Sequence, residues 1–196
     1  MGQDSMLAQL AELPAANIGD AMERLNVVDA AISSQWCGAR LAGRAITVYT
    51  AAGDNSAIHE AVDQITDGDV LVVNGQGETA HALVGELIAG RAKVRGCRGF
   101  IIDGAVRDVA DFAEMRFPVF ARAITPAGPY RNGPGSVNVD VAIGGVVVHP
   151  GDLVLGDDDG VVVVPADKAE DVLAGARAKH EREMVQRAEI GLDVVL

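Results

Sequence analysis

The sequence is poor in lysine and cysteine, and it lacks long apolar runs. Its three lysines lie in charged stretches, whereas Schiff-base catalysis needs a desolvated lysine, so the sequence disfavours that chemistry. Cys37 and Cys97 form neither a CxxC motif nor a metal-ligand spacing, which indicates idle or buried thiols in a reducing compartment. No run approaches the roughly 18 apolar residues of a membrane span, and no basic segment opens a secretory signal. We therefore expect a cytoplasmic protein with no membrane association.

Aromatic residues and positive charge are also scarce. Aromatics make up 4% of the 196 residues, so the core must be built from Val, Ile, Leu and Ala. The net charge of −12 opposes binding to nucleic acid, because that binding depends on Lys and Arg neutralising phosphates. A small anionic ligand would instead need a local cluster of arginines. The chain has no G-x-S-x-G nucleophile motif, and Asn74–Glu78 matches a dinucleotide-binding loop only in part.

Strand and helix patterns alternate through the middle of the chain, and β-branched runs follow them. The expected strands are Ala45–Ala51, Val70–Asn74, Gly99–Ile102 and Val119–Ala123. The expected helices are Met6–Leu25 (interrupted near Pro14), Ser56–Ile65, Glu78–Arg95 and Val109–Met115. Hairpins are expected over Val137–Val148 and Leu153–Val164, before a charged terminal helix over about 166–189.

This order of elements predicts an α/β fold in a single domain over residues 1–196. Strand–helix units combined with hairpins indicate a layered β/β/α architecture with a mixed sheet, similar to swivelling domains. The terminal helix carries many charges and few large apolar residues. We therefore expect it to pack on a neighbouring subunit.

The most informative stretch is Gly99–Asp108, where a short apolar strand is followed by an arginine and an aspartate. We expect a turn at Asp103-Gly104, with Arg107 and Asp108 just beyond the strand, where open α/β sheets bind their ligands. An arginine beside a carboxylate can hold a small anionic substrate and a hard metal ion together. The plainer alternative is that Asp108 caps the next helix and Arg107 forms a surface ion pair.

Two further groups are candidates to join this pair. Asn55 and His59 stand four positions apart near a helix start, so they share a face; alternatively, they are a turn-forming Asn and a surface His. Gly85 and Glu86 place an acid beside a glycine. Inside a continuous helix Glu86 would be a solvated side chain, but if a helix begins here, its free backbone amides could bind a carboxylate.

These motifs, taken in order, resemble the RraA-like family over nearly the whole chain. The similarity rests on Gly53–Asn55, His59, Gly68–Val73, Gly85–Leu87, Gly99–Asp108 and Gly156–Pro165. Its most specific part is the Arg-Asp pair with an acid 21 positions before the arginine. The family includes 4-hydroxy-4-methyl-2-oxoglutarate aldolases, which also decarboxylate oxaloacetate, and regulators of ribonuclease activity. Some members are labelled methyltransferases, but this chain has no S-adenosylmethionine motif to support that label.

The resemblance implies a divalent-metal-dependent class II pyruvate aldolase, assembled as a homotrimer or hexamer with sites between subunits. Asp108 would bind Mg²⁺ or Mn²⁺, partly through ordered waters. Arg107 would bind the substrate and stabilise a pyruvate enolate. Glu183 on the terminal helix, with Glu181 as the alternative, would reach the metal waters of a neighbouring subunit.

The remaining pocket residues follow from the same resemblance. The amides of Gly85, Glu86, Leu87 and Ile88 would hold the pyruvyl carboxylate, and Asn55 and His59 would line the pocket. Glu86 also counts as catalytic, although some aldolases have Asp at its position.

The competing hypothesis is a non-catalytic regulator of ribonuclease activity that acts by protein–protein binding through its acidic surface. The founding regulator of the family departs from the Arg-Asp pair at the acid, whereas this chain has both Arg107 and Asp108. The sequence therefore favours a carbon–carbon lyase that acts on a small 2-oxo acid. It leaves open which 2-oxo acid is the substrate, which metal is used and whether the assembly is a trimer or a hexamer.

Overall fold

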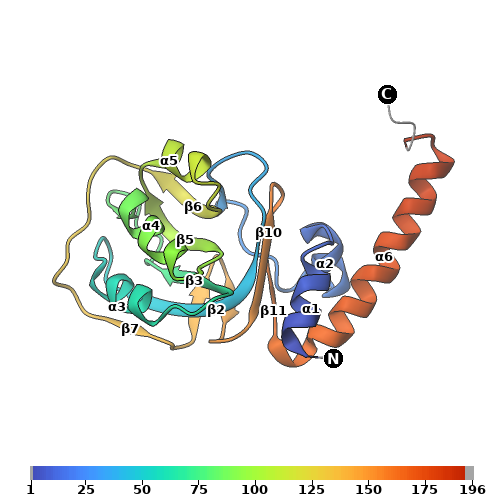
Figure 1. The fold of residues 1–196 in the computed structure, drawn as a ribbon, viewed down its shortest axis with the longest axis horizontal. Helices are drawn as coiled ribbons and strands as arrows, with labels where there is room; N and C mark the ends of the chain where they lie inside the picture. Colours follow the sequence, from blue (N-terminus) through green and yellow to red (C-terminus); the bar gives the residue numbers. More distant parts are fainter. Residues whose placement is uncertain (1, 193–196) are drawn as a thin grey trace.

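The computed structural model describes residues 2–192, and its centre is a parallel β-sheet (Figure 1). Four parallel strands lie side by side in the order β6 (Val119–Ile124), β5 (Gly99–Val106), β3 (Asp69–Asn74) and β2 (Leu41–Thr50). Every residue of β5 is buried. Strands of this kind need apolar side chains on both faces, and Val, Ile, Leu and Ala supply most of them here.

Three helices cover one face of these strands, as Figure 1 shows. They are α3 (Ser56–Gln64), α4 (Glu86–Val94) and α5 (Val109–Glu114). Each lies in a connection between parallel strands, and its apolar side packs against the sheet in one core that includes Phe100 and Phe112. Because the connections all leave from the carboxyl ends of the strands, the starts of the three helices gather at one edge of the sheet.

Beyond β2 the sheet continues with two antiparallel strands, and it curls so that these strands approach the edge formed by β6. β10 (Leu153–Asp157) pairs with β2, and β11 (Gly160–Val164) pairs with β10. At the opposite edge, β1 (Ser33–Ser34) pairs with β6. The ring of Phe120 on β6 comes so close to Gly156 on β10 that a Cβ on this glycine would lie 2.8 Å from the ring. Two strands far apart in the sheet order therefore face each other across the inside of the curl.

A second core fills the inside of the curl. The hairpin of β8 (Val141–Ile143) and β9 (Val146–Val148) contributes four buried side chains to it. The short strand β7 (Gly135–Val137) pairs with the end of β2. The expected mixed α/β class, with a mixed sheet and additional hairpins, is confirmed.

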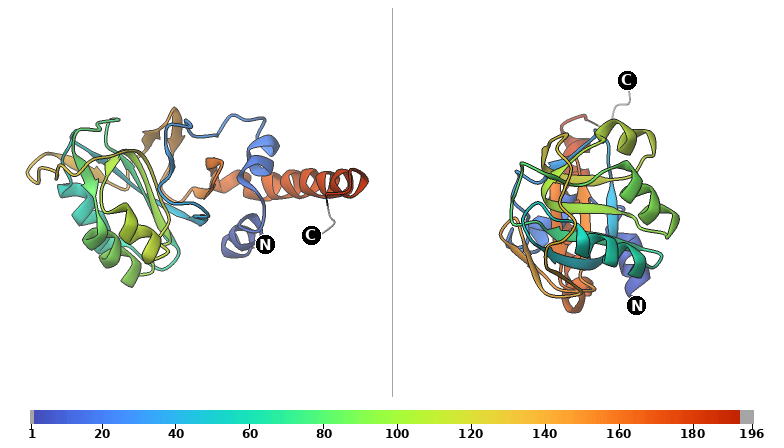
Figure 2. Two further views of the ribbon diagram at one scale, coloured as in Figure 1. Left: turned by 90° about the horizontal axis from the view of Figure 1, so that it is seen from above. Right: turned by 90° about the vertical axis from the view of Figure 1, so that its left-hand side faces the viewer.

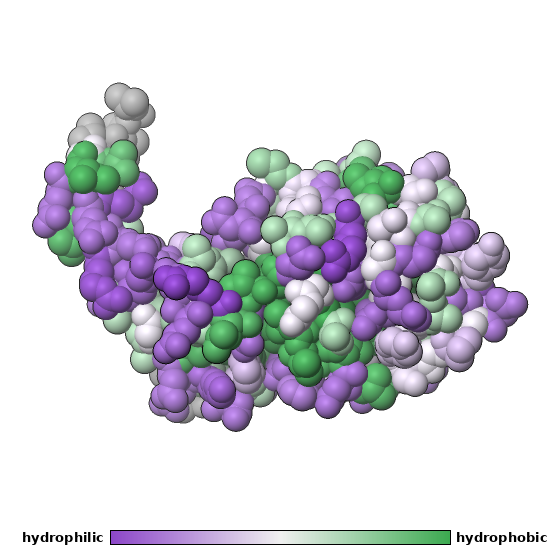
Figure 3. Space-filling view, turned by 180° about the vertical axis from the view of Figure 1, so that it is seen from behind, coloured by the Kyte–Doolittle hydropathy of each residue, from purple (hydrophilic) through white to green (hydrophobic). Residues whose placement is uncertain are grey.

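A third layer packs on the outside of β10 and β11. It consists of α1 (Gln3–Leu10), α2 (Ala15–Ala21), a short 3₁₀ turn (Ala166–Lys168) and α6 (Ala169–Glu189). Within α6 the buried residues end at Ala176. The rest of the helix projects away from the body, as two views show (Figures 1 and 2). Figure 3 shows this projecting part as mostly hydrophilic, beside a hydrophobic area on the body.

The expected helix over Glu78–Arg95 is wrong, because a strand occupies part of it. Residues Ala82–Val84 form β4, which pairs with the end of β5. Gly85 is extended, with φ −148° and ψ −168°, and separates β4 from α4. The helix begins at Glu86, so the alternative with free amides at this point is confirmed. Leu83 and its neighbours in β4 are buried, an environment that periodicity does not reveal.

The expected turn at Asp103-Gly104 is also wrong, since β5 runs on to Val106. Asp103 is tolerated in this buried strand because Arg122 on β6 pairs with its carboxylate. The amide of Gly144 donates a further hydrogen bond to Asp103 at 3.0 Å. A buried carboxylate needs such partners, and they lie on segments distant in sequence.

The other expected elements are present with shifted ends. Met6–Leu25 is two helices, α1 and α2, with Pro14 just before the second. The expected strand Ala45–Ala51 begins earlier, at Leu41. Among residues 2–192, no helix is both long enough and apolar enough to cross a membrane.

Candidate active site

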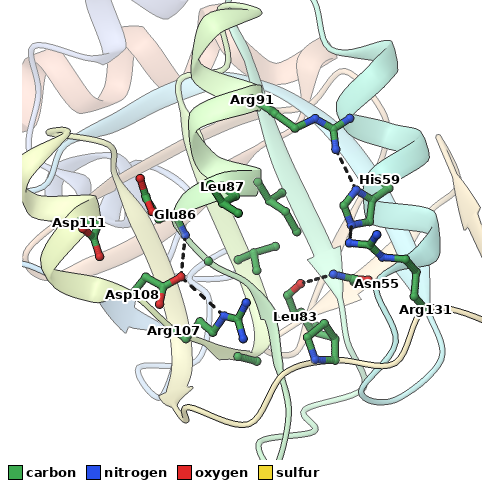
Figure 4. Close-up of a pocket in the computed structure, with 15 residues that line it drawn as sticks. Asn55, His59, Leu83, Glu86, Leu87, Arg91, Arg107, Asp108, Asp111 and Arg131 are labelled. Atoms are coloured by element: carbon green, nitrogen blue, oxygen red, sulfur yellow. Dashed lines mark hydrogen bonds and ion pairs between the residues drawn. The ribbon is translucent and has the colours of Figure 1, made fainter.

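A pocket of about 510 Å³ opens at the edge of the sheet where the parallel strands end (Figure 4). Its walls come from α3, β4, α4, the segment after β5 and the loop after β6. The lining residues are Asn55, His59, Ala82, Leu83, Val84, Gly85, Glu86, Leu87, Ile88, Arg91, Arg107, Asp108, Asp111, Pro129 and Arg131. The structure thus brings together all the residues that the sequence placed in one substrate pocket. Glu183 is not among them.

Arg107 and Asp108 follow the last residue of β5 and lie at the mouth of the pocket. The Nε atom of Arg107 is 3.6 Å from Oδ2 of Asp108, and the two side chains are 44% and 39% exposed. Asp108 precedes α5 but its side chain does not cap that helix. Its Oδ2 atom instead accepts a hydrogen bond from the amide of Glu86, at 3.0 Å. The plain capping interpretation of Asp108 is therefore wrong.

The backbone of Asp108 is left-handed, with φ 59° and ψ 41°. Few residues with a Cβ adopt this conformation. It directs the carboxylate away from α5 and toward the start of α4, which Figure 4 shows across the pocket mouth.

Gly85 allows this close approach. A Cβ on Gly85 would lie 2.3 Å from Oδ2 of Asp108 and 3.0 Å from Cγ of Arg107. The first amides of a helix have no partner within the helix. Here the amide of Glu86 is used by Asp108, while those of Leu87 and Ile88 donate no hydrogen bond within residues 2–192. The start of α4 therefore presents two free donors, with the positive end of the helix dipole, to an anion in the pocket.

Asn55 immediately precedes α3 and His59 lies on it; both line the pocket, as their spacing predicted. The Nδ2 group of Asn55 donates to the carbonyl of Leu83 at 3.0 Å, which ties α3 to β4. The Oδ1 atom of the same side chain is buried and has no hydrogen-bond partner among the described residues. Such an acceptor costs about 1–3 kcal/mol when it is left unpaired.

Sequence reasoning missed seven of the lining residues: Ala82, Leu83, Val84, Arg91, Asp111, Pro129 and Arg131. Arg91 is one helical turn after Leu87 on α4, so the spacing could have placed it beside the pocket. Arg131 belongs to the Pro- and Gly-rich loop after β6. No sequence signal placed it there, because its position depends on how that loop folds back over α3.

Glu183 lies on α6, which is on the other side of the molecule from the helices that surround the pocket (Figure 1). Its carboxylate accepts a hydrogen bond from Asn17 at 2.6 Å and pairs with Lys179 at 3.3 Å. These contacts lower the pKa of Glu183, the hydrogen bond from Asn17 most of all. Glu183 and the exposed Glu181 therefore take no part in the pocket of their own chain.

The donor set of the pocket suits a hydrated hard cation more than a closed metal cage. Within residues 2–192, no group of three or more His, Cys, Asp or Glu side chains gathers around one point. Mg²⁺ commonly needs only one or two carboxylates because it keeps several waters. Asp108 fits this demand, since it is partly exposed and its Oδ1 atom makes no hydrogen bond within the same residues.

Comparisons with known protein families and sequences find matches to one family. The model of the RraA-like family, described as Aldolase/RraA, matches residues 15–163. A protein of Halalkalibacterium halodurans is 35% identical over 189 residues, which cover 96% of this chain and 90% of the relative; it is named "Putative 4-hydroxy-4-methyl-2-oxoglutarate aldolase". A Pseudomonas paraeruginosa protein of the same name is 36% identical over 146 residues, 74% of this chain and 90% of the relative.

Two solved structures share the fold. RraAS2 of Streptomyces coelicolor, described as an unusual member of the RNase ES inhibitor RraA protein family, superimposes with a TM-score of 0.85 at 26% identity, covering 94% of this chain and 98% of that one. The RNA-processing inhibitor RraA from Thermus thermophilis gives a TM-score of 0.71 at 32% identity, covering 78% and 92%. Because the family model matches most of the sequence, and a relative is 35% identical over 96% of this chain, the chain belongs to the RraA-like family.

Proposed function

We propose that this protein is a divalent-metal-dependent lyase of small 2-oxo acids, a class II pyruvate aldolase. Its proposed reactions are the cleavage of 4-hydroxy-4-methyl-2-oxoglutarate and the decarboxylation of oxaloacetate. The observation that carries the proposal is the contact of Asp108 with the amide of Glu86, beside Arg107. This contact brings the carboxylate of Asp108 and the guanidinium of Arg107 next to the two free amides at the start of α4.

The free amides of Leu87 and Ile88 bind the C1 carboxylate of the substrate in this proposal. The guanidinium of Arg107 then faces the C2 oxygen, and Asp108 would hold Mg²⁺ or Mn²⁺. When bound, the metal ion polarises the C2 carbonyl as a Lewis acid. The relatives named as aldolases support this assignment.

In the cleavage step, the bond between C3 and C4 breaks and its electron pair moves onto the C2 oxygen. Arg107 stabilises the resulting pyruvate enolate through charge-assisted hydrogen bonds. The proton of the 4-hydroxyl group leaves as the second carbonyl product forms, and solvent protonates C3 to give pyruvate. Glu86 is the proposed proton acceptor, because no cation lies within ion-pair distance of its carboxylate in residues 2–192.

We also propose that the protein acts as a homotrimer or hexamer in the cytoplasm. The projecting half of α6 lacks a core of its own, which supports contact with another copy. In such an assembly, Glu183 of the partner subunit would be a further carboxylate for the hydrated metal ion.

The test is the release of pyruvate from both substrates, with Mg²⁺, with Mn²⁺ and with EDTA. Arg107→Ala should lower kcat by at least about 100-fold, the scale for losing one stabilising donor. Arg98→Ala is the matched control, because Arg98 flanks the other end of β5 and pairs with Asp67 at the surface. It should leave kcat unchanged.

Lack of metal-dependent turnover of both substrates by the folded protein would contradict the proposal. The regulator hypothesis would then be tested by inhibition of a ribonuclease.

A further inference from the structure

One end of the pocket holds an imidazole between two guanidinium groups. Nδ1 of His59 is 2.9 Å from Nη1 of Arg91, and Nε2 of His59 is 2.7 Å from Nη2 of Arg131. Figure 4 shows these three side chains on the side of the pocket away from Arg107 and Asp108. The pocket therefore has two separate cationic ends.

The hydrogen bonds of His59 cannot all be satisfied without a further acceptor. Burial lowers the pKa of His59, as do the charges of Arg131 and Arg91, so the ring is neutral near pH 7. A neutral imidazole has one acceptor nitrogen and one N–H group. Because guanidinium groups only donate, one of the two arginines faces an N–H group with no acceptor between them.

The positive charge of Arg131 is also unbalanced. Arg91 has a counter-ion, since Asp63 lies 3.1 Å from its Nη2 atom. For Arg131, no carboxylate of residues 2–192 lies within ion-pair distance. A cation without a counter-ion, next to an N–H group without an acceptor, favours an anionic ligand.

The loop that carries Arg131 is held in place by a buried carboxylate. Asp54 is 2% exposed, and its Oδ2 atom accepts hydrogen bonds from the amides of Asn132 and Gly133, both at 2.7 Å. Its Oδ1 atom accepts from the amide of Ser56 at 2.8 Å. Asp54 thereby links the start of α3 to the two residues after Arg131, so it acts as a positioning residue for the contact with His59.

A third observation concerns Asn55, which lines the pocket one turn before His59. Its buried Oδ1 atom lacks a donor. A ligand hydroxyl group is the kind of donor that would satisfy this acceptor.

We propose that Arg131 and His59, with Arg91, form a second anion subsite that receives the distal carboxylate of a dicarboxylic 2-oxo acid. The subsite selects such acids over monocarboxylic 2-oxo acids of the same length. This inference rests on the proposed function for the orientation of the substrate, with its C1 carboxylate at α4. A distal carboxylate supplies a counter-ion for Arg131 and an acceptor for the ring N–H group.

Binding tests the subsite without any turnover. The probes are 2-oxoglutarate and 2-oxopentanoate, which differ by a carboxylate in place of a methyl group, measured by calorimetry on the metal-loaded protein. We expect the wild type to bind 2-oxoglutarate at least about tenfold more tightly, as for a charge-assisted pair. Arg131→Gln should remove this preference, and Arg131→Lys should keep part of it.

The matched control is Arg95→Gln. Arg95 also pairs with Asp63, at 2.8 Å, but it does not line the pocket. This variant should keep the wild-type preference. Equal affinity of the wild type for both probes, or an unchanged preference in Arg131→Gln, would overturn the subsite.

Kinetics separates the subsite from the proposed function. The substrates are 4-hydroxy-2-oxoglutarate and 4-hydroxy-2-oxopentanoate, which again differ by one carboxylate. Arg131→Gln should raise KM for the first by at least about tenfold and leave the second unchanged. If neither is cleaved but the binding preference persists, the lyase proposal fails and the subsite stands. If both are cleaved and Arg131→Gln changes neither KM, the subsite fails and the lyase stands.

Discussion

The carboxylate of Asp108 accepts a hydrogen bond from the amide of Glu86, although the two residues are 22 positions apart. The bond connects the segment after β5 to the first turn of α4. It leaves the next two amides of α4 free and keeps Arg107 beside them. The site therefore depends on how closely these two segments approach each other.

Gly85→Ala should disrupt this approach. The added methyl group would meet Oδ2 of Asp108 at 2.3 Å, and overpacking of this kind costs about 1–3 kcal/mol. We expect a lower Tm and at least about a tenfold lower kcat, since a small misplacement of catalytic groups has large effects. Gly90→Ala is the control in the same helix, because a Cβ there meets nothing within 4 Å. It should stabilise the protein by about 0.5–1 kcal/mol. Wild-type Tm and kcat in Gly85→Ala would contradict this prediction.

Asp108→Asn should separate the structural role of this residue from its charge. The amide side chain keeps an oxygen that can accept from Glu86, so we expect the unfolding free energy to change by about 1 kcal/mol or less. Metal-dependent activity and Mn²⁺ affinity should be lost. Asp158→Asn is the control, because Asp158 also accepts from a distant amide, that of Gly38 at 2.8 Å, but away from the pocket. Retained activity with unchanged Mn²⁺ affinity would place the metal ligand elsewhere.

His59 should titrate below its usual range, which NMR of the imidazole nitrogens can measure. Burial, then Arg131 and Arg91, lower its pKa. The unfolded chain therefore binds more protons at this residue below about pH 6.5, so the contribution of His59 to stability decreases as the pH falls through that window.

Arg131→Gln removes one nearby cation and should raise the pKa of His59. His149 is the internal reference, because its hydrogen bond to Asp140 raises its pKa. A wild-type pKa of His59 at or above 6.5 would show that the two arginines do not hold the ring neutral.

The two cysteines should differ sharply in reactivity. Cys37 is exposed, whereas Cys97 is buried and burial raises its pKa to about 11. Because the thiolate is the reactive form, a disulfide reagent at pH 8 should modify one thiol per folded chain and two in denaturant. Cys37→Ser should abolish the reaction of the folded protein. Equal rates for both thiols in the native protein would contradict the burial of Cys97.

The sequence predicted one half of the pocket much better than the other. Arg107 and Asp108 follow a strongly apolar strand, and Asn55 and His59 share a helical face, so local pattern was enough to place them. Arg131 was missed because its place depends on Asp54 holding the next two amides of a loop more than 70 positions away. The same limit explains Asp103, whose Asp-Gly context indicates a turn until Arg122 on the adjacent strand is taken into account. In both cases the local structure depends on a partner that is distant in sequence.

The left-handed backbone of Asp108 restricts which amino acid can occupy this position. That conformation is adopted readily by glycine and is tolerated by asparagine and aspartate, but it is unfavourable for longer side chains. Glycine would relax the backbone without supplying a charge. Glutamate would supply a charge, and Glu23 shows that a glutamate can adopt a positive φ in this chain, but one more methylene would move its carboxylate away from the amide of Glu86. Aspartate thus supplies the charge at the side-chain length that the contact with the amide of Glu86 requires, so the shape of the chain at this junction limits its chemistry.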